Sequence, residues 1–217
     1  MTQPILRDKS GYYNIDGRKY ISVSKVLGEI RKQGLERWRG TVGNVEADKI
    51  AGMSANKGTK VHAMVGMHLL DQDVALTDQE DIEVQNAYKS YLKYRDEVKF
   101  TNRPVIIDFK TSKQLDKSYK LQLVAYWMAL LNGEIVGKVG IGFNSEVTLY
   151  HPTELYAGTC DAIYLPRKKY QGMEPEFQIV RLCKDKVDYE IENDINLEKC
   201  FEVFLDLKNF VLGYKNI

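Results

Sequence analysis

Two kinds of apolar pattern along the chain predict β-strands. In the first, apolar and polar residues alternate on both sides of Asp16–Gly17, a strong signal for a β-hairpin over residues 12–23. In the second, a continuous apolar run leads into Asp108 and Lys110, as in a strand buried in a sheet. Further strands are predicted over residues 139–143, 145–150, 156–164 and 177–183.

Apolar residues spaced three and four positions apart predict helices between these strands. The first helix would be capped by Ser22 or Ser24 and would end at Gly34, since serine is a favoured N-cap and glycine a frequent helix terminator. Thr59 is predicted to cap a later helix. Together with the strands, these helices predict an α/β fold in which helices flank a mixed central sheet. The other predicted helices cover residues 35–50, 77–98 (opened by a capping box of Thr77 and Glu80), 121–131 and 197–211.

Composition indicates a folded, soluble chain. Of the 217 residues, 44% are hydrophobic and 28% are charged, which is typical of a globular domain and not of disorder. We expect one domain over residues 1–217, in which residues 1–100 form the N-terminal hairpin and helices, residues 101–183 the sheet core and residues 184–217 a C-terminal helical tail. The sequence has no apolar run as long as a membrane span and no signal-peptide hydrophobic region. Its three cysteines are widely spaced, which suits reduced thiols. We therefore expect a cytoplasmic location without membrane association.

Charge gives no overall preference for a nucleic-acid partner. Lysine and arginine total 31 against 30 acidic residues, so the net charge is +1 and any attraction to nucleic acid must come from local clusters. One cluster is Lys113, Lys117 and Lys120, and another is the basic stretch over residues 167–169. A solvated surface is the commoner role of such lysines, and phosphate contact is the alternative. For Trp38, a position in the core is the commoner role, and stacking on a base is the alternative.

Two aspartates stand in or at the end of apolar strands. Asp108 and Lys110 point to the same face, because strand side chains two residues apart share a face. Such a pair at the end of an apolar strand needs compensation, which a surface ion pair or a metal site would provide. Asp161 interrupts a second apolar strand, and Gly158 before it would let a backbone or a phosphate approach closely. Oxygen ligands from the two aspartates suit Mg²⁺ or Mn²⁺, cations that polarise a phosphodiester and activate water.

Three further polar residues stand on predicted helices. Gln122 and Tyr126 are four residues apart, so they lie on one face of an otherwise apolar helix. His62 lies at the margin of the apolar face of its helix. Taken alone, each is most simply a packing residue with local hydrogen bonds. Taken with Asp108 and Asp161, they complete a set suited to phosphodiester cleavage.

In combination, these residues resemble the motifs of PD-(D/E)XK nucleases of the RecB exonuclease type, to which phage-encoded and mitochondrial genome-maintenance exonucleases are similar. Ile107-Asp-Phe-Lys-Thr-Ser112, followed by Gln122-x-x-x-Tyr126, resembles the Asp-x-Lys strand and the next helix of that family. Gly58-Thr-Lys-Val-His62 resembles the helix histidine of this branch, and Gly158-Thr-Cys-Asp161 resembles its Gly-x-x-Asp strand. The resemblance covers most of the chain and implies a restriction-endonuclease-like fold.

The resemblance implies a metal-dependent deoxyribonuclease, in particular an exonuclease of phage or bacterial DNA recombination, repair or processing. Mg²⁺ or Mn²⁺ would be the cofactor and DNA the partner, in the cytoplasm of a bacterial or phage-infected cell. The sequence leaves the oligomeric state open; a homo-oligomer is one option, and it would supply processivity. The implied metal ligands are Asp108, Asp161, His62 and the backbone carbonyl of Phe109. The other implied site residues are Lys110 as the catalytic lysine, Gln122 and Tyr126 as positioning residues, and Glu146 as an acidic residue of the strand before the Gly-x-x-Asp strand. The residues themselves, and not the resemblance, make Lys113, Lys117, Lys120 and Trp38 the candidate substrate contacts.

Two features depart from the family pattern. The Gly-x-x-Asp strand and the strand before it follow the Gln-x-x-x-Tyr helix here, whereas in the family they precede the Asp-x-Lys strand. Residues of about 144–164 would fit more naturally between Phe100 and Thr101, so the chain is either a permuted variant, natural or engineered, or one whose order has been rearranged. Gly66, four residues after His62, stands where the family often has glutamate.

Two other functions are compatible with the same sequence. A catalytically impaired nucleic-acid-binding module on the same fold would bind DNA in a salt-dependent manner without cleaving it. A structural or protein-interaction domain would require Asp108, Lys110 and Asp161 to lie far apart in the folded chain.

Overall fold

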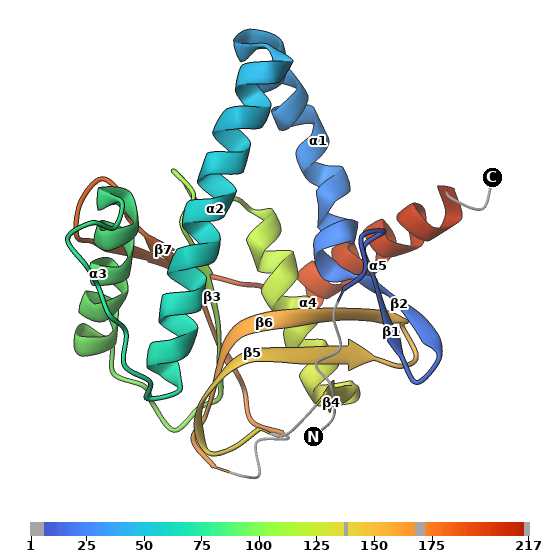
Figure 1. The fold of residues 1–217 in the computed structure, drawn as a ribbon. Helices are drawn as coiled ribbons and strands as arrows, with labels where there is room; N and C mark the ends of the chain where they lie inside the picture. Colours follow the sequence, from blue (N-terminus) through green and yellow to red (C-terminus); the bar gives the residue numbers. More distant parts are fainter. Residues whose placement is uncertain (1–6, 137–138, 168–171, 215–217) are drawn as a thin grey trace.

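Eight strands form one mixed sheet in the described part of the chain, which comprises residues 7–136, 139–167 and 172–214 of the computed structural model. The strands are β1 (Tyr12–Ile15), β2 (Arg18–Ser22), β3 (Val105–Lys110), β4 (Glu134–Val136), β5 (Gly142–His151), β6 (Tyr156–Leu165), β7 (Glu176–Leu182) and β8 (Tyr189–Glu192). Their order is β1-β2-β6-β3-β7-β8, with β5 paired to β6 and β4 paired to β5 (Figure 1). β3 is antiparallel to β6 and parallel to β7, so the sheet is mixed, as predicted.

Helices cover both faces of this sheet (Figure 1). They are α1 (Val23–Val42), α2 (Asn44–Leu69), α3 (Ile82–Glu97), α4 (Ser118–Asn132) and α5 (Leu197–Tyr214). Ile106 of β3 packs in a core cluster with α1, α4 and α5, whereas Ile107 packs in a second cluster with α2 and α3, because successive strand side chains point to opposite faces. The predicted α/β class is confirmed. Among the described residues, none of the helices combines the length and the apolar composition that a membrane span requires.

β6 joins the two parts of the sheet. Its first residues pair with β2, where Tyr156 lies opposite Ile21, and its later residues pair with β3, where Ala162 lies opposite Ile107. Asp161 therefore lies next to the polar end of β3, although the β5–β6 hairpin follows α4 in the sequence. Strand neighbours depend on hydrogen-bond pairing and not on chain order, so the unusual position of the hairpin does not separate the two aspartates.

The N-terminal hairpin is confirmed. β1 and β2 pair antiparallel, and Asp16 and Gly17 at their turn have φ values of 49° and 78°, the left-handed conformation that a two-residue hairpin turn of type I′ requires. Of the two candidate caps for α1, Ser22 is the one used. Its hydroxyl accepts the backbone N–H of Lys25 at 3.1 Å.

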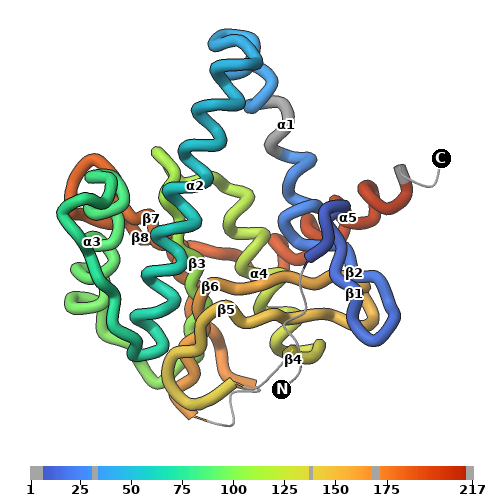
Figure 2. The backbone as a smooth tube through the Cα atoms, viewed as in Figure 1, coloured from blue at the N-terminus to red at the C-terminus, as the bar shows by residue number. Residues whose placement is uncertain are grey.

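α1 and α2 form a helical hairpin that rises from the sheet (Figures 1 and 2). The chain turns at Gly43, whose φ of 86° favours glycine. The predicted helix end at Gly34 is therefore wrong, because one interior glycine costs a helix only about 1 kcal/mol and α1 continues through it. The predicted cap at Thr59 is also wrong, since its hydroxyl donates to the carbonyl of Ala55 inside α2, at 3.0 Å.

Three other boundaries differ from the predictions. α3 begins at Ile82 and not at Thr77, because the Asp81 side chain accepts the N–H of Glu83 at 2.8 Å and caps the helix. The strand predicted over residues 139–143 is only the beginning of β5, at Gly142. β4 and β8 are absent from the prediction because three or four residues are too short for a clear alternation. β8 pairs with β7 and brings part of the segment 184–217, expected to be helical, into the sheet.

Candidate functional site

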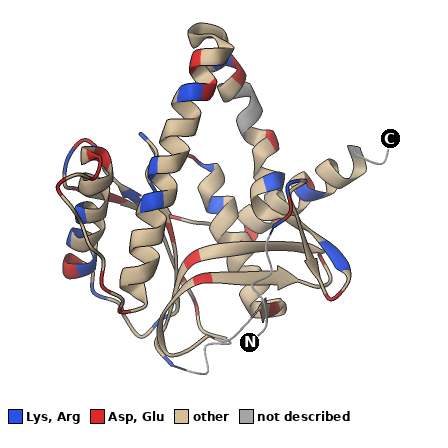
Figure 3. Cartoon of the chain, viewed as in Figure 1, with Lys and Arg blue, Asp and Glu red and all other residues tan. Residues whose placement is uncertain are grey.

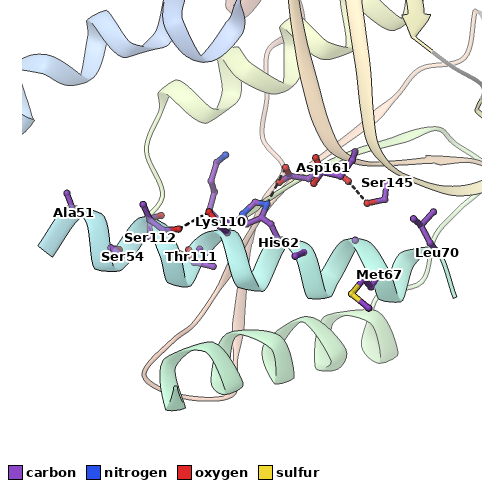
Figure 4. Close-up of a pocket in the computed structure, with 16 residues that line it drawn as sticks. Ala51, Ser54, His62, Met67, Leu70, Lys110, Thr111, Ser112, Ser145 and Asp161 are labelled. Carbon is purple, nitrogen blue, oxygen red and sulfur yellow. Dashed lines mark hydrogen bonds and ion pairs between the residues drawn. The ribbon is translucent and has the colours of Figure 1, made fainter. Parts of the chain in front are cut away.

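An open cavity of about 990 Å³ lies between α2, the end of β3 and the β5–β6 hairpin (Figure 4). Four of the predicted site residues line it: His62, Lys110, Glu146 and Asp161. The α2 face towards the cavity carries small residues, among them Gly58, where an added Cβ would lie 3.2 Å from Oγ1 of Thr111. The small side chains of α2 therefore keep the charged residues accessible from one side.

The two aspartates are positioned by neighbouring strands. The Asp161 carboxylate on β6 accepts the backbone N–H of Phe109 on β3 at 2.8 Å, so the side chain of one strand is fixed by the backbone of the other. Asp108, on the same strand as Phe109, has only 1% of its surface exposed. The structure thus brings together the acids of the two motifs, as the resemblance implies.

Lys110 is held by a short series of contacts from β3 to α4. Its Nζ lies 2.6 Å from Oδ2 of Asp108 and donates to Oε1 of Gln122 at 3.2 Å. The amide nitrogen of Gln122 donates in turn to the hydroxyl of Tyr126 at 2.9 Å. Gln122 and Tyr126 share one face of α4, as their spacing predicts, and that face points to Lys110.

Gly158 makes room for the last member of this series. A Cβ at position 158 would lie 2.5 Å from Cε1 of Tyr126, a distance that real Cβ contacts do not reach. The glycine of the Gly-x-x-Asp motif therefore seats the tyrosine of the Gln-x-x-x-Tyr motif. Gly66 has a comparable role on α2, where an added Cβ would lie 3.2 Å from Oγ of Ser145 on β5. A larger side chain at position 66 would therefore require the Ser145 hydroxyl to shift by a few tenths of an ångström.

His62 and Glu146 approach Asp161 from α2 and β5. Nδ1 of His62 lies 3.4 Å from Oδ1 of Asp161, and the imidazole points from α2 towards that carboxylate (Figure 4). Glu146 has a φ of 52°, a strained value for a residue other than glycine, of the kind that clusters at functional sites. One ligand atom from each of His62, Glu146 and Asp161 lies within 4.8 Å of the other two. The three side chains form a group of metal-ligand type.

The ionisable groups perturb one another. Burial raises the pKa of Asp108; Lys110 opposes this and Asp161 adds to it, so the pKa rises to about 6. Burial also acts to raise the pKa of Asp161, but His62, Lys110 and the Phe109 N–H outweigh it and the pKa is lowered. Burial acts to lower the pKa of His62, but Asp161 raises it overall. Burial and Asp161 raise the pKa of Glu146. Negative charge is therefore least compensated at Asp108 and Glu146.

These observations bear on whether the residues suit a divalent cation. Apart from the ion pair with Lys110, neither buried oxygen of the Asp108 carboxylate has a hydrogen-bond partner among the described residues. The carboxylate oxygens are the donors that Mg²⁺ and Mn²⁺ prefer, and the single imidazole is a donor that the transition metal Mn²⁺ accepts more readily than Mg²⁺. The residues fit such a cation. A role for the Phe109 carbonyl stays an expectation from the resemblance.

The predicted substrate contacts are less well placed. Lys120 donates to the Asp194 carbonyl at 2.6 Å and lies 3.3 Å from Glu192, so its ammonium is directed to the β8 edge and not to the cavity. Lys113 is exposed and lines a smaller cavity of about 310 Å³. Lys117 is exposed just before α4, and Trp38 is half-buried on α1; neither lines the main cavity. Of the basic stretch over residues 167–169, Lys168 and Lys169 lie outside the described residues.

Sequence reasoning missed two residues at the site. Ser145, beside Glu146, donates to the backbone carbonyl of Asp161 at 3.3 Å. Tyr119 lies under the ammonium of Lys110, whose Nζ is 4.7 Å from the ring centroid. A usable signal exists for Tyr119, because it precedes Gln122 by three residues and therefore shares a face of α4 with it.

No family model matches the chain, and no match was found among the curated proteins or among the solved structures. The resemblance to RecB-type nucleases thus rests on the motifs in the sequence. The chemical interpretation of the site rests on the arrangement of its own residues.

Proposed function

We propose that this chain is a metal-dependent nuclease that hydrolyses phosphodiester bonds of DNA. The observation that carries the proposal is the meeting of charged residues from four separate elements around one open cavity. A structural ion pair alone does not account for the arrangement, because Lys110 contacts only Oδ2 of Asp108 and leaves the buried Oδ1 without a hydrogen-bond partner among the described residues. The residues that line the cavity are Lys110 from β3, Asp161 from β6, Glu146 from β5 and His62 from α2. Asp108 from β3 is buried and contacts Lys110 without lining the cavity.

The position of each residue suggests its role. Asp108, Asp161 and His62, with Glu146 adjacent, would hold Mg²⁺ or Mn²⁺. The bound cation would polarise the phosphodiester and lower the pKa of a water molecule. Lys110 is kept charged because Asp108 and Asp161 outweigh the effect of burial and raise its pKa, so its ammonium would stabilise negative charge that develops on the phosphate.

DNA as substrate and exonuclease action come to the proposal from the resemblance to RecB-type nucleases. The charge around the cavity is mixed. Basic positions lie on α2 and near the start of α4, and acidic positions lie on β5 and β6 (Figure 3). On α2, Lys57 pairs with Asp81 and Glu83. Lys60 of α2 likewise pairs with Glu80. Because these two lysines of α2 are already paired, we expect DNA affinity to depend on the bound cation as well as on salt.

The proposal is tested by cleavage of end-labelled single- and double-stranded DNA in Mg²⁺, in Mn²⁺ and in EDTA. The parent should cleave only with a cation. Asp161→Asn and Lys110→Met should lower the rate by about 100-fold or more, as the loss of a charge-stabilising group does in other enzymes. Lys199→Met removes an exposed lysine on α5 and serves as the control, with the rate of the parent. Release of nucleotides from one end would identify an exonuclease.

Two outcomes would count against the proposal. Parental rates for both Asp161→Asn and Lys110→Met would show that the site is assigned to the wrong residues. Salt-dependent DNA binding by a parent that cleaves nothing with either cation would instead favour the nucleic-acid-binding module.

A further inference from the structure

Tyr119 lies against the ammonium of Lys110 at the first turn of α4. The Nζ atom is 4.7 Å from the ring centroid, within the range of a cation–π contact. Tyr119 has 7% of its surface exposed and the Lys110 side chain 17%. Both groups are largely shielded from water, the condition under which a cation and an aromatic ring attract each other most strongly.

The ammonium is held between a strand and a helix. On the strand side, Asp108 is at 2.6 Å. On the helix side are Oε1 of Gln122, at 3.2 Å, and the ring of Tyr119. Tyr119 and Gln122 are three residues apart and act from one face of α4. Lys110 therefore does not depend on Asp108 alone.

Asp108 has two competing uses in the proposed reaction. Its Oδ2 is the nearest partner of Lys110, and its carboxylate is also a ligand of the proposed metal site. When the carboxylate is shared with a cation, the ion pair with Lys110 weakens, and a buried ammonium with less counter-charge needs other compensation. The Tyr119 ring and the Gln122 amide oxygen are placed to supply it.

We propose that Tyr119 is a positioning residue of the nuclease reaction, whose ring keeps the Lys110 ammonium in place while Asp108 serves the metal site. This inference rests on the proposed function. The ring face is what the role requires, and the hydroxyl is not. Phenylalanine should therefore replace Tyr119, and an aliphatic side chain should not.

Cleavage kinetics test this requirement. Tyr119→Phe should keep kcat within about threefold of the parent. Tyr119→Leu and Tyr119→Met should lower kcat about tenfold, the size of a shielded cation–π contact, without changing KM or the Mn²⁺ affinity measured by calorimetry. In a Lys110→Met background, Tyr119→Leu should lower the residual rate no further, because Tyr119 acts through Lys110. Full activity of the aliphatic variants, equal loss in Tyr119→Phe, or additive loss in the double variant would overturn the proposal.

A stability measurement separates this proposal from the nuclease function. In a double-mutant cycle of Tyr119→Leu and Lys110→Met, unfolded in urea without metal, the two changes should be coupled by roughly 2- to 30-fold in the unfolding constant. If the parent cleaves DNA but the two changes are not coupled in unfolding, only the role of Tyr119 is overturned and the nuclease function stands. Coupling in a protein that does not cleave would overturn the nuclease function and retain the support of Lys110 by Tyr119.

Discussion

A methyl group added at Gly158 should disturb the proposed active site without touching its charged groups. The new Cβ would lie 2.5 Å from Cε1 of Tyr126 and 3.2 Å from Cγ2 of Val23. The Tyr126 ring is buried, and its hydroxyl accepts the hydrogen bond of Gln122, whose amide oxygen holds Lys110. We therefore predict that Gly158→Ala displaces the Tyr126 ring and, through Gln122, misaligns Lys110.

The size of the effect follows from the overlap. Non-bonded carbon atoms are most stable at roughly 3.5–4.0 Å, so the ring must move by about 1 Å. Overpacking of this kind costs about 1–3 kcal/mol. In a chain of this length, each kcal/mol lowers Tm by about 2–4 °C, so Tm should fall by roughly 2–12 °C. A comparable displacement of Lys110 should lower the cleavage rate by up to about 100-fold.

Thermal unfolding and cleavage kinetics of Gly158→Ala can be compared with those of Gly52→Ala. Gly52 is exposed in α2, and a Cβ there would meet nothing within 4 Å, so alanine should stabilise the helix by up to about 1 kcal/mol. Adding Tyr126→Leu should make Gly158→Ala less costly, because the clashing ring is gone. Parental stability and activity in Gly158→Ala would refute the reasoning.

Three further predictions concern packing outside the site. In urea unfolding, Glu154→Ala should cost about 3 kcal/mol, because it leaves the Lys208 ammonium, on a side chain only 5% exposed, without its counter-charge. Lys208→Met should cost about 1 kcal/mol, because the Glu154 side chain is 33% exposed and can be hydrated. Equal costs would contradict this. Ser22→Ala should remove an N-cap worth about 1 kcal/mol, with Ser24→Ala much milder. Burial lowers the pKa of His151 below 6.5, so the unfolded state binds a proton before the folded state does as pH falls. The folded parent therefore loses stability as pH falls. The stability difference between the parent and His151→Asn should shrink from about pH 8 to about pH 5.5.

Local patterns were enough for the parts of the site that lie within one element. Strand alternation placed Asp108 and Lys110 on one face, and the spacing of Gln122 and Tyr126 placed both on one face of α4. Both relations depend only on residues a few positions apart. That Asp161 reaches the N–H of Phe109 depends on the pairing of β6 with β3, which the residues alone do not specify and which only the resemblance implied.

Features that depend on distant packing were not predictable. The left-handed backbone at Glu146 has no signal in its sequence, because glutamate does not favour that conformation. Lys120 turns away from the cavity because β8 offers it Glu192, and β8 is too short to be recognised. Gly34 is a helix terminator in most sequences, yet α1 continues past it to Gly43. At Lys120 a longer-range contact outweighs the local preference.

The two ends of the β5–β6 hairpin lie close to Phe100 in the folded chain. The ring of Phe100 lies 4.9 Å from that of Phe143 and 5.1 Å from that of Tyr164, and the latter two rings are 5.1 Å apart. Gly142 and Leu165 are paired directly across the hairpin. The first and last residues of the hairpin therefore lie next to each other, and both lie beside the segment that connects α3 to β3.

We predict that a chain with residues 144–164 moved between Phe100 and Thr101, with a short glycine linker at each join, folds to the same arrangement. The pairs of β6 with β3 are kept, and among the β5–β6 pairs only Phe143–Tyr164 is divided between the moved segment and the rest of the chain. Circular dichroism and urea unfolding should show one cooperative transition close to that of the parent. The same segment placed after Asp71, far from its sheet partners in sequence, is the control. Loss of cooperative unfolding in the first rearranged chain would show that connectivity, and not strand pairing, assembles the site.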